Sequence, residues 1–224
     1  MTDHPVVTRC DDPEAVFARV AEVMAAAIDG ARTIHGRAHV ALSGGSAVNA
    51  LDLLGPMLPD WREVHLWYVD ERVVPLDDEE SNHHQCSAHL DAPDATWHPI
   101  KPELGPEGAA AAYAEELGDT VLDVSLNGMG PDGHTASLFP GFPQLEADGV
   151  CVAVHDSPKP PSDRITLTLP KINESRRILL LATGAEKAPM LERVIAGPDR
   201  AVPASLLERE RLEIITDQAG LEGR

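Results

Sequence analysis

The feature that most constrains the fold of this 224-residue chain is its alternation of short apolar runs with helical stretches. Strand-like runs occur at residues 39–42, 64–69, 121–126, 150–154, 177–182 and 212–216. Strands that alternate with helices form a mainly parallel sheet covered on both faces. We therefore predict an α/β chain with a Rossmann-like, mainly parallel sheet flanked by helices, built as a single domain over residues 1–224.

Several stretches carry helix signals. Asp12 caps a helix that has Pro13 at its first position, and Ser81 with Asn82 caps another. Residues 104–117 are rich in Ala and Glu, which favour helix, and helical spacing also follows residue 46 up to residue 54.

A glycine-rich segment after the run 121–126 carries the clearest sign of chemistry. Residues 128–141, here called the His loop, have the sequence GMGPDGHTASLFPG, in which Asp132 and His134 are the only titratable side chains. Ligands of open α/β sheets bind beyond the carboxyl ends of strands, where this loop is expected. His134 is suited to general base work near neutral pH, with Asp132 to orient it. The alternative is a turn in which Asp132 caps a helix and His134 is solvated.

A second glycine-rich loop follows the run 39–42. It consists of Ser43, Gly44, Gly45 and Ser46, and is here called the glycine loop. A strand, a glycine-rich turn and a helix together bind phosphate through backbone amides. A nucleotide site is not indicated because no Gly-Lys-Ser/Thr follows. A plain connection between strand and helix is the alternative.

Three cations lie at strand ends. Arg72, in Asp70-Glu71-Arg72, follows the run 64–69 and offers a guanidinium fork for phosphate, although a surface ion pair is the alternative. Arg164 opens a strand after the proline-rich residues 156–163, the proline loop, which we expect to border the site. Lys187 lies near a helix start after the run 177–182. Solvated surface positions are the alternative for Arg164 and Lys187.

Together these segments resemble the 6-phosphogluconolactonases, which share a superfamily with the glucosamine-6-phosphate deaminases and isomerases. The His loop is similar to the signature of that family. Further segments resemble the family in the same order along nearly the whole chain: residues 42–46, 69–72, 81–82, 164–168, 184–187 and 203–205. The resemblance adds Asp70, Asn82 and Gly130 to the candidate substrate-binding residues. This chain departs from the family where Ala47-Val48 replaces the usual Thr-Pro.

The resemblance implies hydrolysis of 6-phospho-D-glucono-1,5-lactone to 6-phospho-D-gluconate, the second step of the oxidative pentose phosphate pathway. In this hypothesis His134 activates water with Asp132 as its partner, and backbone amides of residues 128–133 hold the developing charge. The phosphate is expected on the glycine loop, Arg72, Arg164 and Lys187.

Two alternatives remain open: a deaminase or isomerase of the same superfamily, and a sugar-phosphate-binding module without catalysis. Deaminases resemble the signature but carry a Glu where this chain has Phe139, and they tend to have an aromatic residue in place of Arg72. Both departures favour lactone hydrolysis. The binding module would bind tightly without turnover, and the presence of Asp132 and His134 argues against it.

Composition narrows the partners. The formal charge of −19, from 18 Lys and Arg against 37 Asp and Glu, disfavours nucleic acid, whereas a few gathered cations suffice for a small anion. Cys10, Cys86 and Cys151 are too scattered for a disulfide framework. No signal peptide or membrane-spanning stretch is evident. We expect a cytoplasmic monomer or homodimer.

One cluster resembles a metal site. His83, His84, Cys86 and His89 lie close together in the sequence, but their spacing matches no usual zinc pattern. We interpret the cluster as a polar helix face, and expect neither a metal nor a cofactor.

Overall fold

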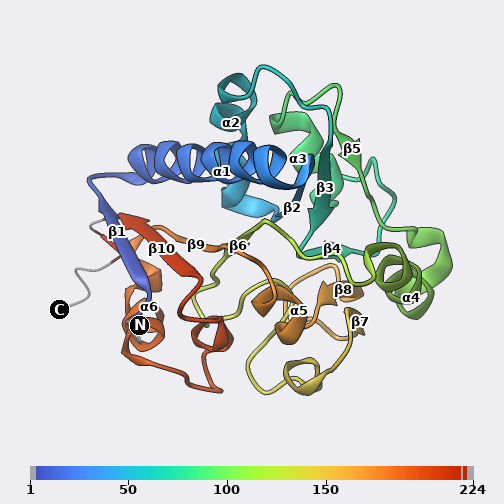
Figure 1. Ribbon diagram of the computed structural model, residues 1–224. Helices are drawn as coiled ribbons and strands as arrows, with labels where there is room; N and C mark the ends of the chain where they lie inside the picture. The colour runs from blue at the N-terminus through green and yellow to red at the C-terminus, as the bar shows by residue number, and fades with distance from the viewer. Residues whose placement is uncertain (1–3, 218, 221–224) are drawn as a thin grey trace.

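The computed structural model describes residues 4–217, 219 and 220. Its main sheet has strand order β1-β10-β9-β6-β2-β3-β5, with every neighbouring pair parallel (Figure 1). The predicted α/β fold with a mainly parallel sheet is confirmed. The strands are β1 (Val6–Cys10), β2 (Ala38–Leu42), β3 (Val64–Tyr68), β5 (Thr96–Trp97), β6 (Val124–Gly128), β9 (Ile178–Ala182) and β10 (Leu212–Asp217).

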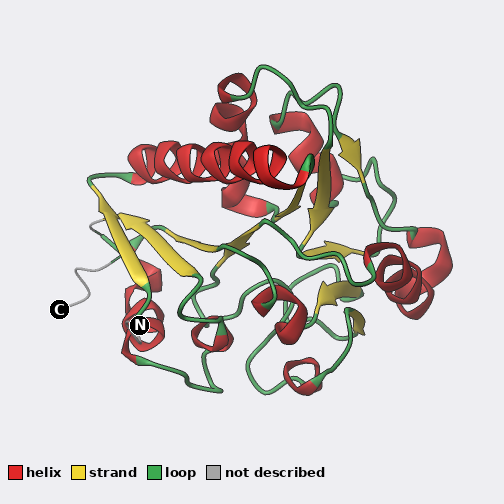
Figure 2. Ribbon diagram, viewed as in Figure 1, coloured by secondary structure: helices red, strands yellow, loops and turns green. Residues whose placement is uncertain are grey.

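Helices cover both faces of this sheet (Figure 2). One apolar core joins the sheet to α1 (Pro13–His35), α2 (Leu51–Met57) and α3 (Asn82–His89). The other core joins it to α4 (Gly105–Leu117), α5 (Leu169–Asn173) and α6 (Ala188–Ala196). The predicted start of α1 is confirmed, since the Asp12 carboxylate accepts a hydrogen bond from the Ala15 amide at 2.8 Å. Short 3-10 helices are η1 (Gly45–Ala50), η2 (Pro102–Leu104), η3 (Pro143–Glu146), η4 (Ala185–Lys187) and η5 (Pro203–Leu206).

A second, antiparallel sheet lies beside the second core. It contains β4 (Asp70–Arg72), β8 (Arg164–Leu167) and β7 (Cys151–Val154) in that order. Arg72 and Arg164 are register partners across β4 and β8, so two candidate cations that are distant in sequence become neighbours. Sequence periodicity predicted the strands that became β7 and β8 but did not separate them from the parallel sheet.

Element boundaries differ from the prediction at two places near the site. The half-buried strand predicted at residues 121–126 is β6, which begins at Val124 and is almost fully buried because it lies between β9 and β2. The helix predicted after residue 46 begins as η1 and becomes α2 only at Leu51. The sequence pattern missed three strands: β1 and β5, which are the edges of the main sheet, and β4 of the antiparallel sheet.

The strand order reverses direction between β2 and β6. From β2 the chain adds β3 and β5 on one side, while β6, β9 and β10 follow one another on the other side. Loops at the carboxyl ends of the two strands that flank such a switch diverge and leave a crevice. The glycine loop follows β2 and the His loop begins at the end of β6, so both candidate loops border this crevice.

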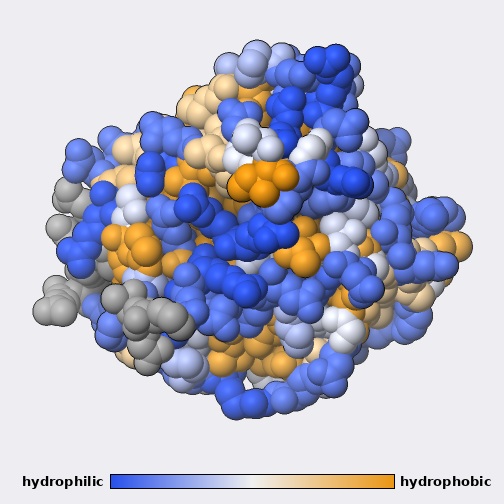
Figure 3. All heavy atoms as spheres, in the orientation of Figure 1, coloured by the Kyte–Doolittle hydropathy of each residue, from blue (hydrophilic) through white to orange (hydrophobic). Residues whose placement is uncertain are grey.

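The surface agrees with the strongly acidic composition. Figure 3 shows a face that is mainly hydrophilic, with small separate clusters of apolar residues. Among the described residues, no helix combines the length and the apolar character that crossing a bilayer requires.

Candidate active site

A pocket of about 360 Å³ opens at the switch between β2 and β6. All the predicted substrate-binding residues line it: Ser43, Gly44, Gly45, Ser46, Asp70, Arg72, Asn82, Gly130, Arg164 and Lys187. His134 also lines the pocket, and Asp132 contacts His134 from the side. The fold thus brings together loops that are separated by more than a hundred residues.

His134 and Asp132 form a close pair. The Nδ1 atom of His134 lies 2.5 Å from Asp132 Oδ1, and the His134 side chain is 13% exposed. When Nδ1 carries the proton and donates a hydrogen bond to the carboxylate, Nε2 is unprotonated and has a free lone pair. This is the tautomer that a general base requires.

Gly130 is what allows the His loop to close. A Cβ atom at this position would lie 2.1 Å from Cε1 of His134, which is far inside van der Waals contact. The loop is also held by main-chain bonds from Gly130 N to His134 O at 2.9 Å and from Gly133 N to Gly130 O at 3.0 Å. Because these two amides are already bonded inside the loop, the predicted contact of residues 128–133 with a substrate oxygen does not extend to them.

The surroundings of the pair favour a neutral imidazole. Burial lowers the pKa of His134 below its ordinary value; Asp132 and Asp70 oppose that shift, while the positive charge of Lys159 adds to it. Burial acts to raise the pKa of Asp132, but the hydrogen bond and charge of His134 outweigh it and leave that pKa below its ordinary value. At neutral pH the pair is therefore an imidazole beside a carboxylate.

Phe139 covers His134 from within the same loop. Its ring centroid lies 4.7 Å from that of His134, and Phe139 is 1% exposed. The position at which the deaminases carry a carboxylate is thus filled by an apolar ring that neither accepts nor donates a proton.

Arg72 is a phosphate-binding candidate whose hydrogen-bonding capacity is only partly used. Its Nη1 donates to the Glu80 carbonyl at 2.5 Å, but its buried Nε has no hydrogen-bond partner among the described residues. Buried donors without partners are uncommon, so this guanidinium has capacity for a ligand. The alternative of a surface ion pair for residues 70–72 is wrong, because Asp70 is 6% and Glu71 0% exposed.

Glu71 is a structural residue that the sequence did not reveal. Its carboxylate accepts hydrogen bonds from the amides of Arg72, Asn82 and His83 at 2.6, 2.7 and 2.7 Å, and from the Ser81 hydroxyl at 3.1 Å. Burial raises the pKa of Glu71 to about 7, against the lowering effect of these amides. Glu71 thereby ties β4 to the start of α3.

Helix α3 in turn supports the glycine loop. The Gln85 side chain accepts from Gly45 N at 2.9 Å, and Asn82 Oδ1 would lie 2.1 Å from a Cβ at Gly44. Asn82 Nδ2 also donates to the Asp70 carbonyl at 2.8 Å. A side chain at position 44 would therefore have to displace Asn82, whose hydrogen bond to Asp70 holds it in place.

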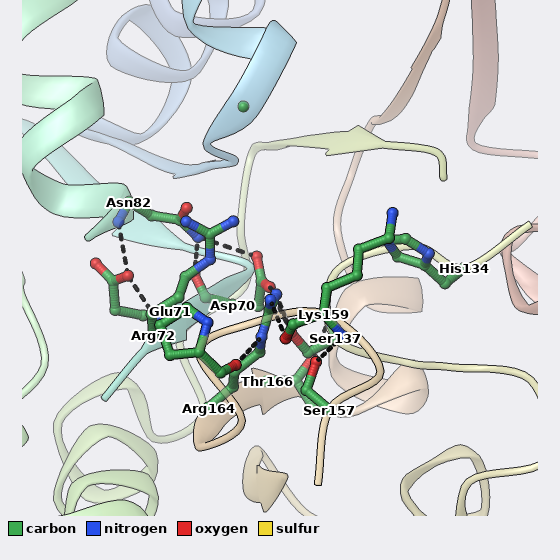
Figure 4. A network of polar contacts seen from close by, with 12 residues as sticks. Asp70, Glu71, Arg72, Asn82, His134, Ser137, Ser157, Lys159, Arg164 and Thr166 are labelled. Carbon is green, nitrogen blue, oxygen red and sulfur yellow. Dashed lines mark hydrogen bonds and ion pairs between the residues drawn. The ribbon is translucent and has the colours of Figure 1, made fainter. Parts of the chain in front are cut away.

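Lys187 and Lys159 complete the cationic lining. Burial lowers the pKa of Lys187 below its ordinary value, with Lys159 adding to the shift and Glu186 and Asp217 opposing it. Lys159 was not predicted individually, although the proline loop that carries it was expected to border the site. Figure 4 shows its side chain extended toward His134. In the sequence Lys159 is a single lysine among prolines, a pattern that predicts no particular function.

Arg164 lines the pocket, but most of its donors are engaged with the protein. Its Nε donates to the Pro161 carbonyl at 3.1 Å, and its Nη2 donates to the carbonyls of Lys159 and Pro160 at 3.0 and 3.1 Å. Its Nη1 faces Asp70 Oδ2 at 4.0 Å. The guanidinium therefore binds the main chain of the proline loop.

The predicted polar face of α3 holds for His84, which is exposed, but not for Cys86. Cys86 is 0% exposed and packs in the core, while His83 Nδ1 lies 2.6 Å from the Tyr68 hydroxyl and His89 Nδ1 lies 2.9 Å from Asp52 Oδ2. Among the described residues, no group of three His, Cys, Asp or Glu side chains is arranged to hold a metal ion.

Comparison with known proteins shows which family this chain resembles. Residues 11–216 match the family model described as glucosamine-6-phosphate isomerases/6-phosphogluconolactonase. The chain is 40% identical to the 6-phosphogluconolactonase of Rattus norvegicus over 207 residues, which is 84% of this chain and 79% of the rat protein. It is also 40% identical to that of Mycobacterium tuberculosis over 218 residues, 87% of each chain. The crystal structure of a 6-phosphogluconolactonase from Shewanella baltica superposes with a TM-score of 0.87 at 29% identity, covering 97% of this chain and 99% of that one.

Proposed function

This chain belongs to the glucosamine-6-phosphate isomerase/6-phosphogluconolactonase family, and from that premise we propose that it hydrolyses 6-phospho-D-glucono-1,5-lactone to 6-phospho-D-gluconate. The reaction is the second step of the oxidative pentose phosphate pathway. The observation that carries the proposal is the Asp132–His134 pair at one side of a pocket whose other lining includes Arg72, Lys159 and Lys187. An ester bearing a phosphate needs both a base for water and cations for its charge.

In the proposed mechanism His134 acts as base and then as acid. Its Nε2 takes a proton from water as the water oxygen attacks the lactone carbonyl carbon. When the tetrahedral intermediate collapses, the bond from that carbon to the ring oxygen breaks, and the imidazolium returns the proton to the ring oxygen. Asp132 accepts the hydrogen bond from Nδ1–H of His134 throughout and stabilises the transient imidazolium.

The phosphate is proposed to lie between the glycine loop, Arg72 and Lys187. Arg72 has a buried Nε without a partner among the described residues, and Lys187 is a partly desolvated ammonium. Charge-assisted bonds from such groups are the strong ones in phosphate recognition. Because Ala47 and Val48 replace the usual Thr-Pro, the contact on this side is assigned to Ser46 and the main chain.

A coupled assay with freshly generated 6-phosphogluconolactone, corrected for spontaneous hydrolysis, tests the proposal. We expect hydrolysis well above the spontaneous rate with the wild-type protein and close to that rate with His134→Ala. Tight binding of 6-phosphogluconate with no turnover would instead support a binding module.

Glucosamine 6-phosphate separates the lactonase from the deaminase of the same family. Phe139 packs on His134 in place of a second carboxylate, so the imidazole lacks the partner that supports ring opening in the deaminases. We expect neither ammonia nor fructose 6-phosphate to form from this substrate. Their appearance at a rate comparable to lactone hydrolysis would reverse the choice.

A further inference from the structure

Arg164 is the residue whose observed contacts differ most from the role that its position suggests. It lies at the wall of an anion-binding pocket, yet it is only 4% exposed. A guanidinium carries five N–H groups. Three of them donate to the consecutive carbonyls of Lys159, Pro160 and Pro161, at 3.0 to 3.1 Å. The other two, on Nη1, face Ser137 Oγ at 3.5 Å and Asp70 Oδ2 at 4.0 Å.

The segment that Arg164 holds has few other means of ordering itself. Three of the residues in the proline loop are prolines, which have no amide hydrogen to donate. Two hydrogen bonds form inside the loop, from Ser157 N to Ser162 O at 3.1 Å and from Lys159 N to Ser157 Oγ at 3.4 Å. The guanidinium therefore supplies the contact that fixes the carbonyls of residues 159–161.

The hydrogen bonds from Arg164 place the Lys159 side chain at the pocket. The residue is exposed, while its main chain is held from below, and its side chain extends toward His134 (Figure 4). Its charge acts on both sides of the site, because it lowers the pKa of His134 and that of Lys187.

We propose that Arg164 is a positioning residue that acts through Lys159: it fixes the proline loop so that the Lys159 ammonium meets the anionic substrate, and makes no direct bond to the phosphate. The inference rests on the proposed function for its substrate. It reassigns Arg164 from the phosphate-binding set that its sequence position suggested.

The test compares Lys159→Met, Arg164→Lys and the double variant in the lactonase assay. Arg164→Lys keeps the positive charge but cannot span three carbonyls. We expect each single variant to raise KM about tenfold, the worth of one hydrogen bond to a charged group. The KM of the double variant should not exceed the higher of the two single-variant KM values. Losses that multiply would show that the two side chains contact substrate independently and would overturn the proposal.

The pH profile supplies a readout that general loosening of the structure would not move. The charged groups that act on His134 are Asp132, Asp70 and Lys159, and Lys159 lowers the pKa of the imidazole. Removing or displacing the ammonium should therefore shift the acid limb of kcat/KM to higher pH. We expect the same shift in Lys159→Met and Arg164→Lys. An unmoved limb in Arg164→Lys alone contradicts the proposal.

Two matched controls accompany these variants. Arg211→Lys makes the same substitution in a guanidinium that donates to the Asn173 and Ser175 carbonyls, at 2.8 and 3.5 Å, beside the amino end of β10. It should leave both KM and the acid limb unchanged. Lys187→Met should raise KM and leave the limb nearly in place, since the charges that act most strongly on His134 are those of Asp132, Lys159 and Asp70.

A crystal structure of the wild-type protein with 6-phosphogluconate decides the matter without any variant, including the case in which Arg164→Lys fails to fold. We expect Arg164 to keep its three carbonyl contacts and Lys159 to reach the bound anion. A phosphate oxygen within hydrogen-bond distance of the guanidinium would overturn the proposal. Absence of wild-type turnover would instead count against the lactonase assignment, so the two failures are distinguishable.

Discussion

Glu71 in β4 and Asp132 in the His loop are carboxylates beside the same pocket, but their surroundings differ. Glu71 is 0% exposed, and its two oxygens accept four hydrogen bonds, three of them from main-chain amides. Asp132 has a side chain that is 41% exposed, and its principal partner is the His134 imidazole. A carboxylate that is hydrogen-bonded to main-chain amides holds the backbone in place. One that is hydrogen-bonded to a titratable ring affects the pKa and tautomer of that ring.

The same contrast separates the two walls of the pocket. On the Glu71 wall, Asn82 and the glycine loop are held by α3, and little can move without breaking buried bonds. On the Asp132 wall, the proposed base and its partner lie in a connecting loop, the kind of segment that commonly carries chemistry on a rigid scaffold. Substitutions on the two walls should therefore affect different measurements.

The largest effect is expected from His134→Ala on the Asp132 wall. Loss of the general base should lower kcat by roughly 10² to 10⁴, while the affinity for 6-phosphogluconate stays nearly unchanged. Turnover and calorimetric binding measure the two quantities separately. His89→Ala, which removes an imidazole paired with Asp52 on α2, is the control. Near wild-type turnover in folded His134→Ala would exclude the imidazole as base.

The next effect is expected from Asp132→Asn, which tests whether this carboxylate governs the proton of His134. We expect kcat to fall about ten- to a hundredfold, as the neutral amide no longer orients the ring or stabilises the imidazolium. Asp132 raises the pKa of His134, so its loss should move the acid limb of kcat/KM to lower pH. This is the opposite direction to that expected for Lys159→Met. An unshifted limb would make Asp132 a loop-capping residue only.

Arg72→Ala probes the other wall and should act on binding. We expect the affinity for 6-phosphogluconate to fall about tenfold, because a charge-assisted bond that only the phosphate makes is lost. The affinity for gluconate should change little. Calorimetry with both ligands makes the comparison, with Arg62→Ala, an exposed arginine paired with Asp60, as control. Equal losses for the two ligands would remove Arg72 from the phosphate site.

Glu71→Gln should have the smallest effect on turnover and a clear effect on stability. An amide nitrogen would face main-chain donors, which should lower the free energy of unfolding by about 1–3 kcal/mol. Burial raises the pKa of Glu71 in the folded protein to about 7, above its ordinary value of 4.5. Its contribution is thus present in full below pH 4.5 and declines as pH rises through 7.

Thermal unfolding of wild type and Glu71→Gln between pH 4.5 and 8 checks this expectation. The gap in Tm should narrow toward the alkaline end. Glu22→Gln, in an exposed pair with Arg19, should show almost no gap at any pH. A constant gap for Glu71→Gln would mean that the carboxylate does not titrate in this range.

The sequence predicted the two loops because the contacts that shape each loop lie within a few residues of one another. Glycines in the glycine loop and the His loop serve close approaches within a few residues, as at Gly130, and a strand before each loop predicted its place in the sheet. Asp132 and His134 are two positions apart, so their pairing also follows from the chain itself. For these elements, pattern and structure agree.

The remaining parts of the site depend on tertiary contacts that no local pattern encodes. The role of Glu71 comes from α3, eleven and twelve residues away, and Lys159 is placed by a guanidinium from the following strand. Arg164 was predicted to contact the phosphate because its charge lies at a strand end, but charge alone does not reveal that three of its N–H groups donate to the carbonyls of residues 159–161. Strand β6 was placed three residues early and expected to be half-buried because Asp123 and Ser125 alternate with apolar residues, yet both are buried.

Burial of Glu71 also decides where an incoming anion does not bind. The amides of Asn82 and His83 open α3 beside the pocket, and a helix start is an attractive seat for phosphate. Both amides are already bound by a carboxylate that belongs to the chain. A free phosphate would have to displace this tethered competitor, whose local concentration is fixed by the fold and does not dilute. The Glu71 carboxylate thus keeps the amino end of α3 from serving as an anion site.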